Sequence, residues 1–126
     1  NKVGKGEVIW CAGLTELDDR QSVNEVFVNL VGELTNNDFS VLANCSSNVE
    51  IIVFRDENDY YVNAVSLSGD DKCIYPVEIT LCIDGTVASV TELHGGEDIG
   101  FVQNDNKLTF NDTVTVFRAY KVRVNK

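Results

Sequence analysis

The spacing of apolar residues along the chain changes once, at Asn36 and Asn37. Before this point apolar side chains recur with the i, i+4, i+7, i+8 spacing that places them on one face of an α-helix. They are Val23, Phe27, Leu30, Val31 and Leu34. Ser22 and Glu25 have the spacing of a capping box, which marks a helix start. The pattern predicts an amphipathic helix that begins near Ser22 and fails at Thr35-Asn36-Asn37.

After Asn37 apolar and polar residues alternate in short runs separated by Asn, Asp, Ser and Gly, as in antiparallel strands. The predicted strands are Val49–Phe54, Tyr60–Ser66, Val77–Ile83, Thr86–Leu93, Ile99–Gln103, Lys107–Phe110 and a long last strand, Thr113–Val124. Asp84 and Gly85 between two alternating runs indicate a tight hairpin. The predicted fold is mainly β, an antiparallel two-sheet β-sandwich (immunoglobulin-like) preceded by one short strand and one amphipathic helix.

The first strand-like run, Glu7–Cys11, is apolar at successive positions, which is typical of a parallel strand covered on both faces. No other segment of this type follows, so we expect its partners outside this sequence. We therefore divide the chain into residues 1–37, a strand and helix leading in from an upstream domain, and residues 38–126, the sandwich. The chain contains no methionine, and we expect it to be a segment of a larger protein.

The chain is acidic, with 20 Asp and Glu against 10 Lys and Arg, a net charge of −10. A field of this sign repels phosphate groups and anionic lipids, so we expect neither nucleic acid nor a membrane surface as partner. No apolar run reaches the roughly 18 to 20 residues needed to cross a bilayer. With 126 residues, 44% of them hydrophobic, the chain has enough apolar mass for one buried core.

The four cysteines, Cys11, Cys45, Cys73 and Cys82, include no closely spaced pair, which disfavours a zinc site. Four cysteines could form two disulfides, in three alternative connectivities. Three of the four cysteines adjoin apolar runs, where a free thiol serves as a small hydrophobe. We therefore favour reduced thiols and, by a small margin, a cytoplasmic location.

Catalytic chemistry has few candidates. His94 is the only histidine, and no G-x-S-x-G elbow accompanies it. The adjacent acids between the predicted strands are Asp56 and Glu57, Asp70 and Asp71, and Glu97 and Asp98. All fall in polar turns, where they are expected to be hydrated, whereas a glycosidase needs one acid with a raised pKa. Residues 56–59 and 68–71 offer oxygen ligands for calcium but lack the EF-hand spacing. We assign no catalytic, cofactor-binding or metal-binding residue.

Sugar binding on an aromatic platform has limited support. Trp10 lies inside an apolar run and is expected in a core, and Tyr60 and Tyr61 are adjacent in a strand, so they face opposite ways. Tyr75 and Tyr120 remain as candidates for such a platform.

Several segments resemble one enzyme family. Gly6–Cys11 followed by the helix at Val26–Val31 resembles the exit from the glutamine-amidotransferase-like trimerisation domain of β-galactosidases and related glycoside hydrolases. The segments that resemble the small C-terminal sandwich of these enzymes are Val49–Arg55, Tyr60–Val65, Tyr75–Ile79 and the closing strand Val116–Val122. In that family the catalytic carboxylates reside in an upstream TIM barrel, so the resemblance implies none here.

The expected function is that of a non-catalytic accessory domain of a β-galactosidase-like glycoside hydrolase. Its expected partners are the other domains of the parent enzyme and, as a second partner, carbohydrate. A carbohydrate-binding module and an immunoglobulin-like adhesion domain are the alternatives.

Overall fold

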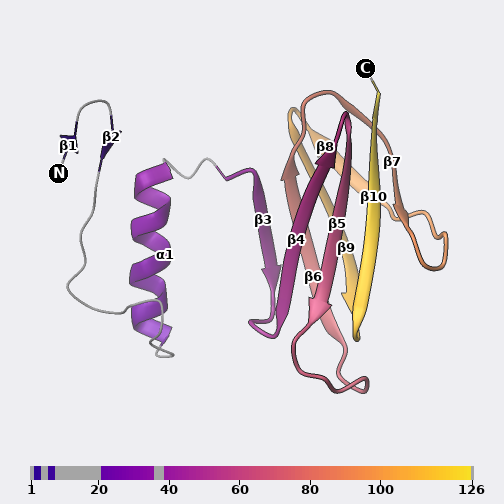
Figure 1. The fold of residues 1–126 in the computed structure, drawn as a ribbon, viewed down its shortest axis with the longest axis horizontal. Helices are drawn as coiled ribbons and strands as arrows, with labels where there is room; N and C mark the ends of the chain where they lie inside the picture. The colour runs from indigo at the N-terminus through magenta and orange to yellow at the C-terminus, as the bar shows by residue number, and fades with distance from the viewer. Residues whose placement is uncertain (1, 4–5, 8–20, 36–38, 126) are drawn as a thin grey trace. The chain divides into compact units, whose positions relative to one another are not determined.

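The computed structural model describes residues 2–3, 6–7, 21–35 and 39–125, which belong to two compact units, Asn1–Phe39 and Ser40–Lys126. In the first unit β1 (Lys2–Val3) pairs antiparallel with β2 (Gly6–Glu7) (Figure 1). The strand predicted over Glu7–Cys11, with Trp10, lies outside the described residues apart from Glu7.

The predicted helix is confirmed as α1 (Gln21–Thr35). It begins before Ser22, so Ser22 lies in the first turn and does not precede the helix as a cap. At the other end the Thr35 hydroxyl donates to the carbonyl oxygens of Val31, at 2.9 Å, and Gly32, at 3.3 Å. In the described parts of the chain, no helix is long and apolar enough to span a membrane.

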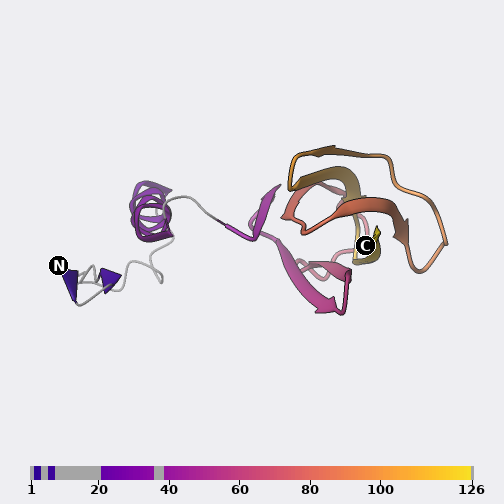
Figure 2. The same cartoon turned by 90° about the horizontal axis from the view of Figure 1, so that it is seen from above.

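The second unit is an antiparallel sandwich of two four-stranded sheets, which confirms the predicted fold. Its strands are β3 (Val41–Cys45), β4 (Val49–Asp56), β5 (Asp59–Ser66), β6 (Tyr75–Cys82), β7 (Thr86–Glu92), β8 (Phe101–Asn104), β9 (Lys107–Val114) and β10 (Phe117–Asn125). One sheet has the order β4-β5-β10-β7 and the other β3-β6-β9-β8. Figure 1 shows β4, β5 and β10 in front of β8 and β9, and Figure 2 shows the sandwich from above.

The core lies between the sheets and is formed by alternate residues of each strand. In β5, Tyr60, Val62 and Ala64 are buried, whereas the residues between them are half-buried. Phe110 of β9 and Tyr120 of β10 meet from opposite sheets, with ring centroids 5.1 Å apart in an edge-to-face arrangement. Period-two alternation therefore predicts the buried face of the strands correctly.

The prediction that the strands on either side of Asp84 and Gly85 pair as a hairpin is wrong. The chain does turn there, but β6 pairs with β3 and β9, and β7 pairs with β10 in the other sheet. Gln103 holds the turn, because its side-chain amide donates to the Gly85 carbonyl and its oxygen accepts the Val87 amide, both at 2.8 Å. A turn dipeptide thus locates the bend and does not determine which strands pair.

The last predicted strand, Thr113–Val124, is wrong as a single element. β9 ends at Val114 and β10 begins at Phe117, because β9 pairs with β6 while β10 pairs with β5 and β7 in the opposite sheet. The chain changes sheets between these strands without a Gly, Pro or Asn, so the sequence there contains no turn signal. The pattern also does not predict β3, and it begins β8 at Ile99 where the structure begins it at Phe101.

The Gly85 backbone requires glycine. Its φ is +119°, and a Cβ there would lie 2.9 Å from Val124 Cγ1 and 3.0 Å from the Asn125 carbonyl oxygen. We expect Gly85→Ala to lower the free energy of unfolding by about 2 kcal/mol, measured by urea denaturation followed by circular dichroism. Gly69 has a φ of +67°, but no atom lies within 4 Å of a Cβ added there. Gly69→Ala should therefore lower the free energy of unfolding by about 1 kcal/mol. Equal losses in the two variants would contradict a role for packing against β10.

Candidate functional site

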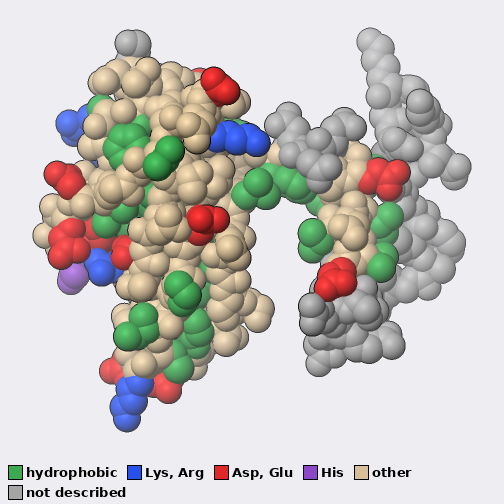
Figure 3. Space-filling view, turned by 180° about the vertical axis from the view of Figure 1, so that it is seen from behind, with side chains coloured by type: hydrophobic (Ala, Val, Ile, Leu, Met, Phe, Trp, Pro, Cys, Tyr) green, Lys and Arg blue, Asp and Glu red, His purple; other side chains and the backbone are tan. Residues whose placement is uncertain are grey.

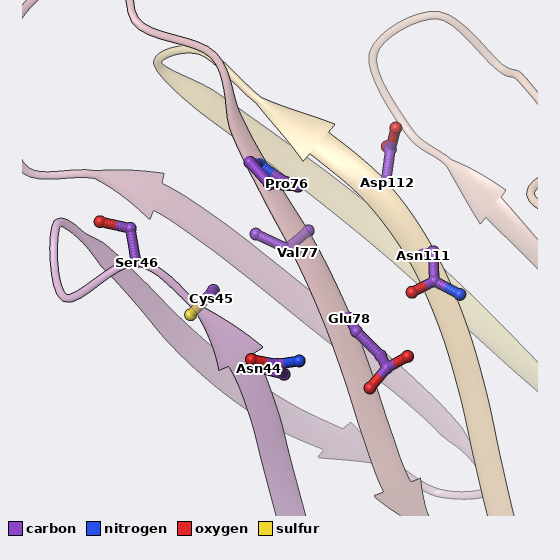
Figure 4. Close-up of a pocket in the computed structure, with 8 residues that line it drawn as sticks. All are labelled: Asn44, Cys45, Ser46, Pro76, Val77, Glu78, Asn111 and Asp112. Carbon is purple, nitrogen blue, oxygen red and sulfur yellow. The ribbon is translucent and has the colours of Figure 1, made fainter.

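A depression of about 400 Å³ lies on the β3-β6-β9 side of the sandwich, where β3 ends. Pairing between β3 and β6 stops at Cys45 and Val77, while β6 extends further, through Pro76, in its pairing with β9. The chain turns away from the sheet after Cys45, at Ser46, and leaves one end of β6 uncovered. The residues that line the hollow are Asn44, Cys45, Ser46, Pro76, Val77, Glu78, Asn111 and Asp112 (Figure 4).

Three polar side chains, Asn44, Glu78 and Asn111, form one row across the depression (Figure 4). In the strand register Asn44 is opposite Glu78 and Glu78 is opposite Asn111, so the three side chains share a face of the sheet. All three are exposed, and none of them bonds to another residue in the described part of the chain. Their donors and acceptors are therefore open to solvent and to a ligand. We call these residues the polar row.

Asp112 also lines the depression, but its carboxylate is engaged elsewhere. One oxygen accepts the Thr113 amide at 2.7 Å, and the other accepts the Tyr120 hydroxyl at 2.8 Å. Arg118 Nε lies 3.8 Å from the second oxygen. Glu78 is therefore the lining carboxylate that remains open to a ligand.

A second group of polar residues is centred on a buried acid, Glu92, and its other members, Arg118 and Asp112, are half-buried. Glu92, at the end of β7, is fully buried and accepts the amide hydrogens of His94, at 3.0 Å, and Gly95, at 2.5 Å. Arg118 Nη1 of β10 lies 3.5 Å from the same carboxylate, and Arg118 also approaches Asp112 of β9 in the opposite sheet. These three residues, which we call the buried cluster after Glu92, connect both sheets and the loop after β7. Among the described residues every buried side-chain nitrogen and oxygen has a hydrogen-bond partner.

The electrostatics of the buried cluster indicate a structural role. The hydrogen bond from the Gly95 amide, followed by those from His94 and the charge of Arg118, holds the pKa of Glu92 below its ordinary value although burial opposes this. Burial and the hydrogen bond to Asp112 raise the pKa of Tyr120. Glu92 is thus a charged acceptor, whereas the acid of a glycosidase needs a raised pKa to hold its proton.

The pKa of Asp59 is also lowered, chiefly by the hydrogen bond from Lys121, whose Nζ lies 2.9 Å away. A carboxyl group with a lowered folded-state pKa stabilises the fold above its unfolded pKa, and this contribution is lost as the pH falls through the folded value. We expect the thermal midpoint to fall as the pH is lowered from about 5 to about 3, as measured by calorimetry. Because the pKa of Glu92 is lowered as well, Glu92→Gln should make the thermal midpoint depend less on pH in this range. An unchanged slope in that variant would contradict the assignment to Glu92.

The residues that the sequence singles out for catalysis make separate contacts in the structure. His94 is exposed, and it is its backbone amide that contacts Glu92. Glu97 is largely exposed, 3.9 Å from Arg118, while the Asp98 carboxylate accepts the Thr91 hydroxyl at 3.2 Å.

In the other two acidic turns the carboxylates of Asp59 and Asp70 are engaged. The backbone of Asp56 pairs with that of Asp59 at the β4–β5 hairpin, and the Asp59 carboxylate is bound to Lys121 of β10. Asp70 accepts the Lys72 amide at 2.9 Å within its own turn. Across residues 2–3, 6–7, 21–35 and 39–125, no group of three or more acids, histidines and cysteines is arranged to hold a metal ion.

The aromatic candidates for a sugar platform do not provide one. Tyr120 is fully buried against Phe110, because its position in β10 points into the core. Tyr75 is half-buried and packs against the same core. Tyr60 and Tyr61 face opposite sides as predicted, with Tyr60 buried.

Cys45 and Cys73 are free thiols, and Cys45 packs against the core, where burial raises its pKa. Cys11 lies outside the described residues.

Sequence reasoning missed both groups of residues described above. Asn44 and Asn111 are far apart in sequence and meet Glu78 only through strand pairing that the pattern does not specify. The sequence does give a weak indication that Glu92 is buried. It is an acidic residue at an inward position of a predicted strand, between Val90 and the Gly95-Gly96 turn. Alternation alone would have placed it in the core.

Comparison with solved structures finds a protein of similar fold. No family model matches the chain, and no curated protein matches its sequence. The fold is similar to part of an alpha-L-fucosidase, isoenzyme 2 from Paenibacillus thiaminolyticus, with a TM-score of 0.70 and 14% identity. The likeness covers 82% of this chain but 18% of the fucosidase chain. The fold is thus one that occurs as a β-domain within a glycoside hydrolase.

Proposed function

We propose that this chain supplies a non-catalytic accessory domain to a larger carbohydrate-active enzyme, where it packs against and stabilises the other domains. The fold supports this proposal, since a glycoside hydrolase carries a similar domain as a small part of its length. The chemistry supports it as well, because the buried acid has a lowered pKa and is fully hydrogen-bonded.

The observation that carries the proposal is an apolar surface on the outside of the β4-β5-β10-β7 sheet. It consists of Ile52, Phe54 and Phe117, which are exposed, with the half-buried Val65 and Ala119, and Asn63 lies between Ile52 and Ala119 in the strand register; we call this surface the apolar face. The side chains of Phe54 and Phe117 are 58% and 53% exposed. Large apolar side chains gathered on one face are typical of a surface that binds another protein surface.

We assign this face to another domain of the same enzyme. The fucosidase of similar fold carries the likeness over 18% of its chain, so most of that enzyme consists of other parts against which such a face can pack. Nucleic acid is disfavoured as a partner by the net charge of −10. The finer proposal, a β-galactosidase-like parent, is supported by the residue patterns at Gly6–Cys11 and Tyr75–Ile79.

The test compares two pairs of substitutions in the full-length enzyme. Phe54→Ser with Phe117→Ser should lower its thermal midpoint by about 4 °C or more, because each ring loses a buried contact. Leu42→Ser with Val102→Ser is the matched control, since these side chains are 46% and 60% exposed but lie on the opposite sheet. In the isolated 126-residue chain neither pair of substitutions should change the thermal midpoint greatly. Equal midpoints for both full-length variants would overturn the assignment.

A further inference from the structure

We propose that the depression beside β3 is a binding site for a neutral saccharide, held by the polar row of Asn44, Glu78 and Asn111. This inference goes beyond the proposed packing role. The depression lies on the β3-β6-β9-β8 side, whereas the apolar face lies on the other sheet, so an enzyme that covers the apolar face leaves this site open.

The chemistry of the row matches sugar hydroxyl groups. Each hydroxyl both donates and accepts, and an asparagine amide offers one group of each kind. Asn44 and Asn111 stand on either side of Glu78, whose two carboxylate oxygens only accept. Adjacent strands lie about 4.8 Å apart, so the row extends over roughly 10 Å. That is wide enough for one or two pyranose rings with hydroxyls directed at the sheet.

The floor of the depression supplies apolar contact. Pro76 is exposed beside Val77, which is buried beneath the surface (Figure 4). Pro76 also brings no backbone N–H to the uncovered stretch of β6, so this part of the sheet edge is less able to pair with a foreign strand. The C–H surface of a sugar ring can lie on the proline ring while its hydroxyls reach the polar row. A volume of about 400 Å³ is within the usual range of small-molecule sites.

Charge selects the class of sugar. Glu78 is the open carboxylate of the site and the chain carries a net charge of −10, so uronates and sulfated sugars are repelled. Figure 3, which views the sandwich from the side of β8 and β9, shows a surface made mostly of uncharged polar side chains and backbone. Such a surface suits a neutral ligand that is rich in hydroxyl groups.

The test is an NMR titration of the 126-residue chain with neutral oligosaccharides that contain galactose, fucose, xylose or glucose, and with one uronate-containing oligosaccharide. We expect saturable shifts at residues 44–46, 76–78 and 111–113 with at least one neutral sugar. Glu78→Ala and Asn111→Ala should each weaken binding about tenfold, the effect of one or two lost hydrogen bonds. Glu50→Ala, on the other sheet, and Asn104→Ala, at the end of β8, are exposed matched controls that should bind as the parent chain does.

Three outcomes would overturn the site: no shifts with any sugar at tens of millimolar, shifts centred on the apolar face, or equal binding by Glu78→Ala and Glu50→Ala. Preferential binding of the uronate would overturn the neutral class. Because all four substitutions are at exposed positions, an unchanged spectrum outside the site verifies the fold of each variant. The titration uses the chain alone, so its failure leaves the packing proposal standing, and the full-length midpoint test can fail without affecting this site.

Discussion

Replacing Glu92 by alanine is expected to lower the free energy of unfolding of this chain by about 3 kcal/mol, because it removes a buried carboxylate that two backbone amides and Arg118 contact. The amides of His94 and Gly95 would lose their acceptor, and Arg118 would lose its nearest contact with Glu92, at 3.5 Å. Urea denaturation followed by circular dichroism measures the loss. For a domain of this size the corresponding fall in thermal midpoint exceeds about 10 °C.

Glu97→Ala is the matched control for this prediction. Glu97 contacts the same Arg118 nitrogen, at 3.9 Å, but its side chain is 67% exposed. Exposed ion pairs contribute little, so this variant should lose less than about 0.5 kcal/mol. Similar losses in the two variants would show that burial of Glu92 is not the source of its effect. Glu92→Gln, which keeps an acceptor for one amide, should fall between them.

Tyr120→Ala is expected to cost about 4 kcal/mol, the loss typical of a large aromatic residue removed from a core. Tyr120 is fully buried, packs against Phe110 of the opposite sheet and donates its hydroxyl hydrogen to Asp112. Tyr120→Phe keeps the ring and removes the hydrogen bond, so it should cost about 1.5 kcal/mol. Both values come from the same denaturation measurement.

Tyr61→Ala provides the comparison on the outer side of the same sheet. Tyr61 is half-buried, with Lys121 Nζ 5.5 Å from its ring centroid. An exposed cation–π contact is worth about 0.5 to 1 kcal/mol, so this variant should lose about 1 kcal/mol. If Tyr61→Ala cost as much as Tyr120→Ala, the contact of Tyr120 with the opposite sheet would not be the main connection between the layers.

Local periodicity predicts much of this fold. The spacing from Val23 to Leu34 locates α1, and alternation locates β5 and β6 and their buried sides, since each depends on residues close in sequence. Strand pairing depends on distant residues. Asp84-Gly85 therefore suggested a hairpin where the chain passes between sheets, and the crossing between Val114 and Phe117 contained no turn residue.

The candidate site is less predictable than the fold for the same reason. The polar row exists only because β3 and β9 flank β6 in one register, which brings Asn44 and Asn111 to either side of Glu78. From the sequence, the candidate site residues were paired acids such as Asp70 and Asp71, which are adjacent along the chain. In the structure the Asp70 carboxylate binds within its own turn, so adjacency in sequence did not produce a site.

The proposed accessory role is tested most directly by removing residues 40–126 from the proposed parent enzyme and following heat inactivation together with turnover at low temperature. A stabilising domain predicts that kcat/KM at low temperature is retained within a few fold, while inactivation begins at a lower temperature than in the intact enzyme. A folded deletion variant that has lost turnover at low temperature, or one that resists heat as well as the intact enzyme does, would contradict this role.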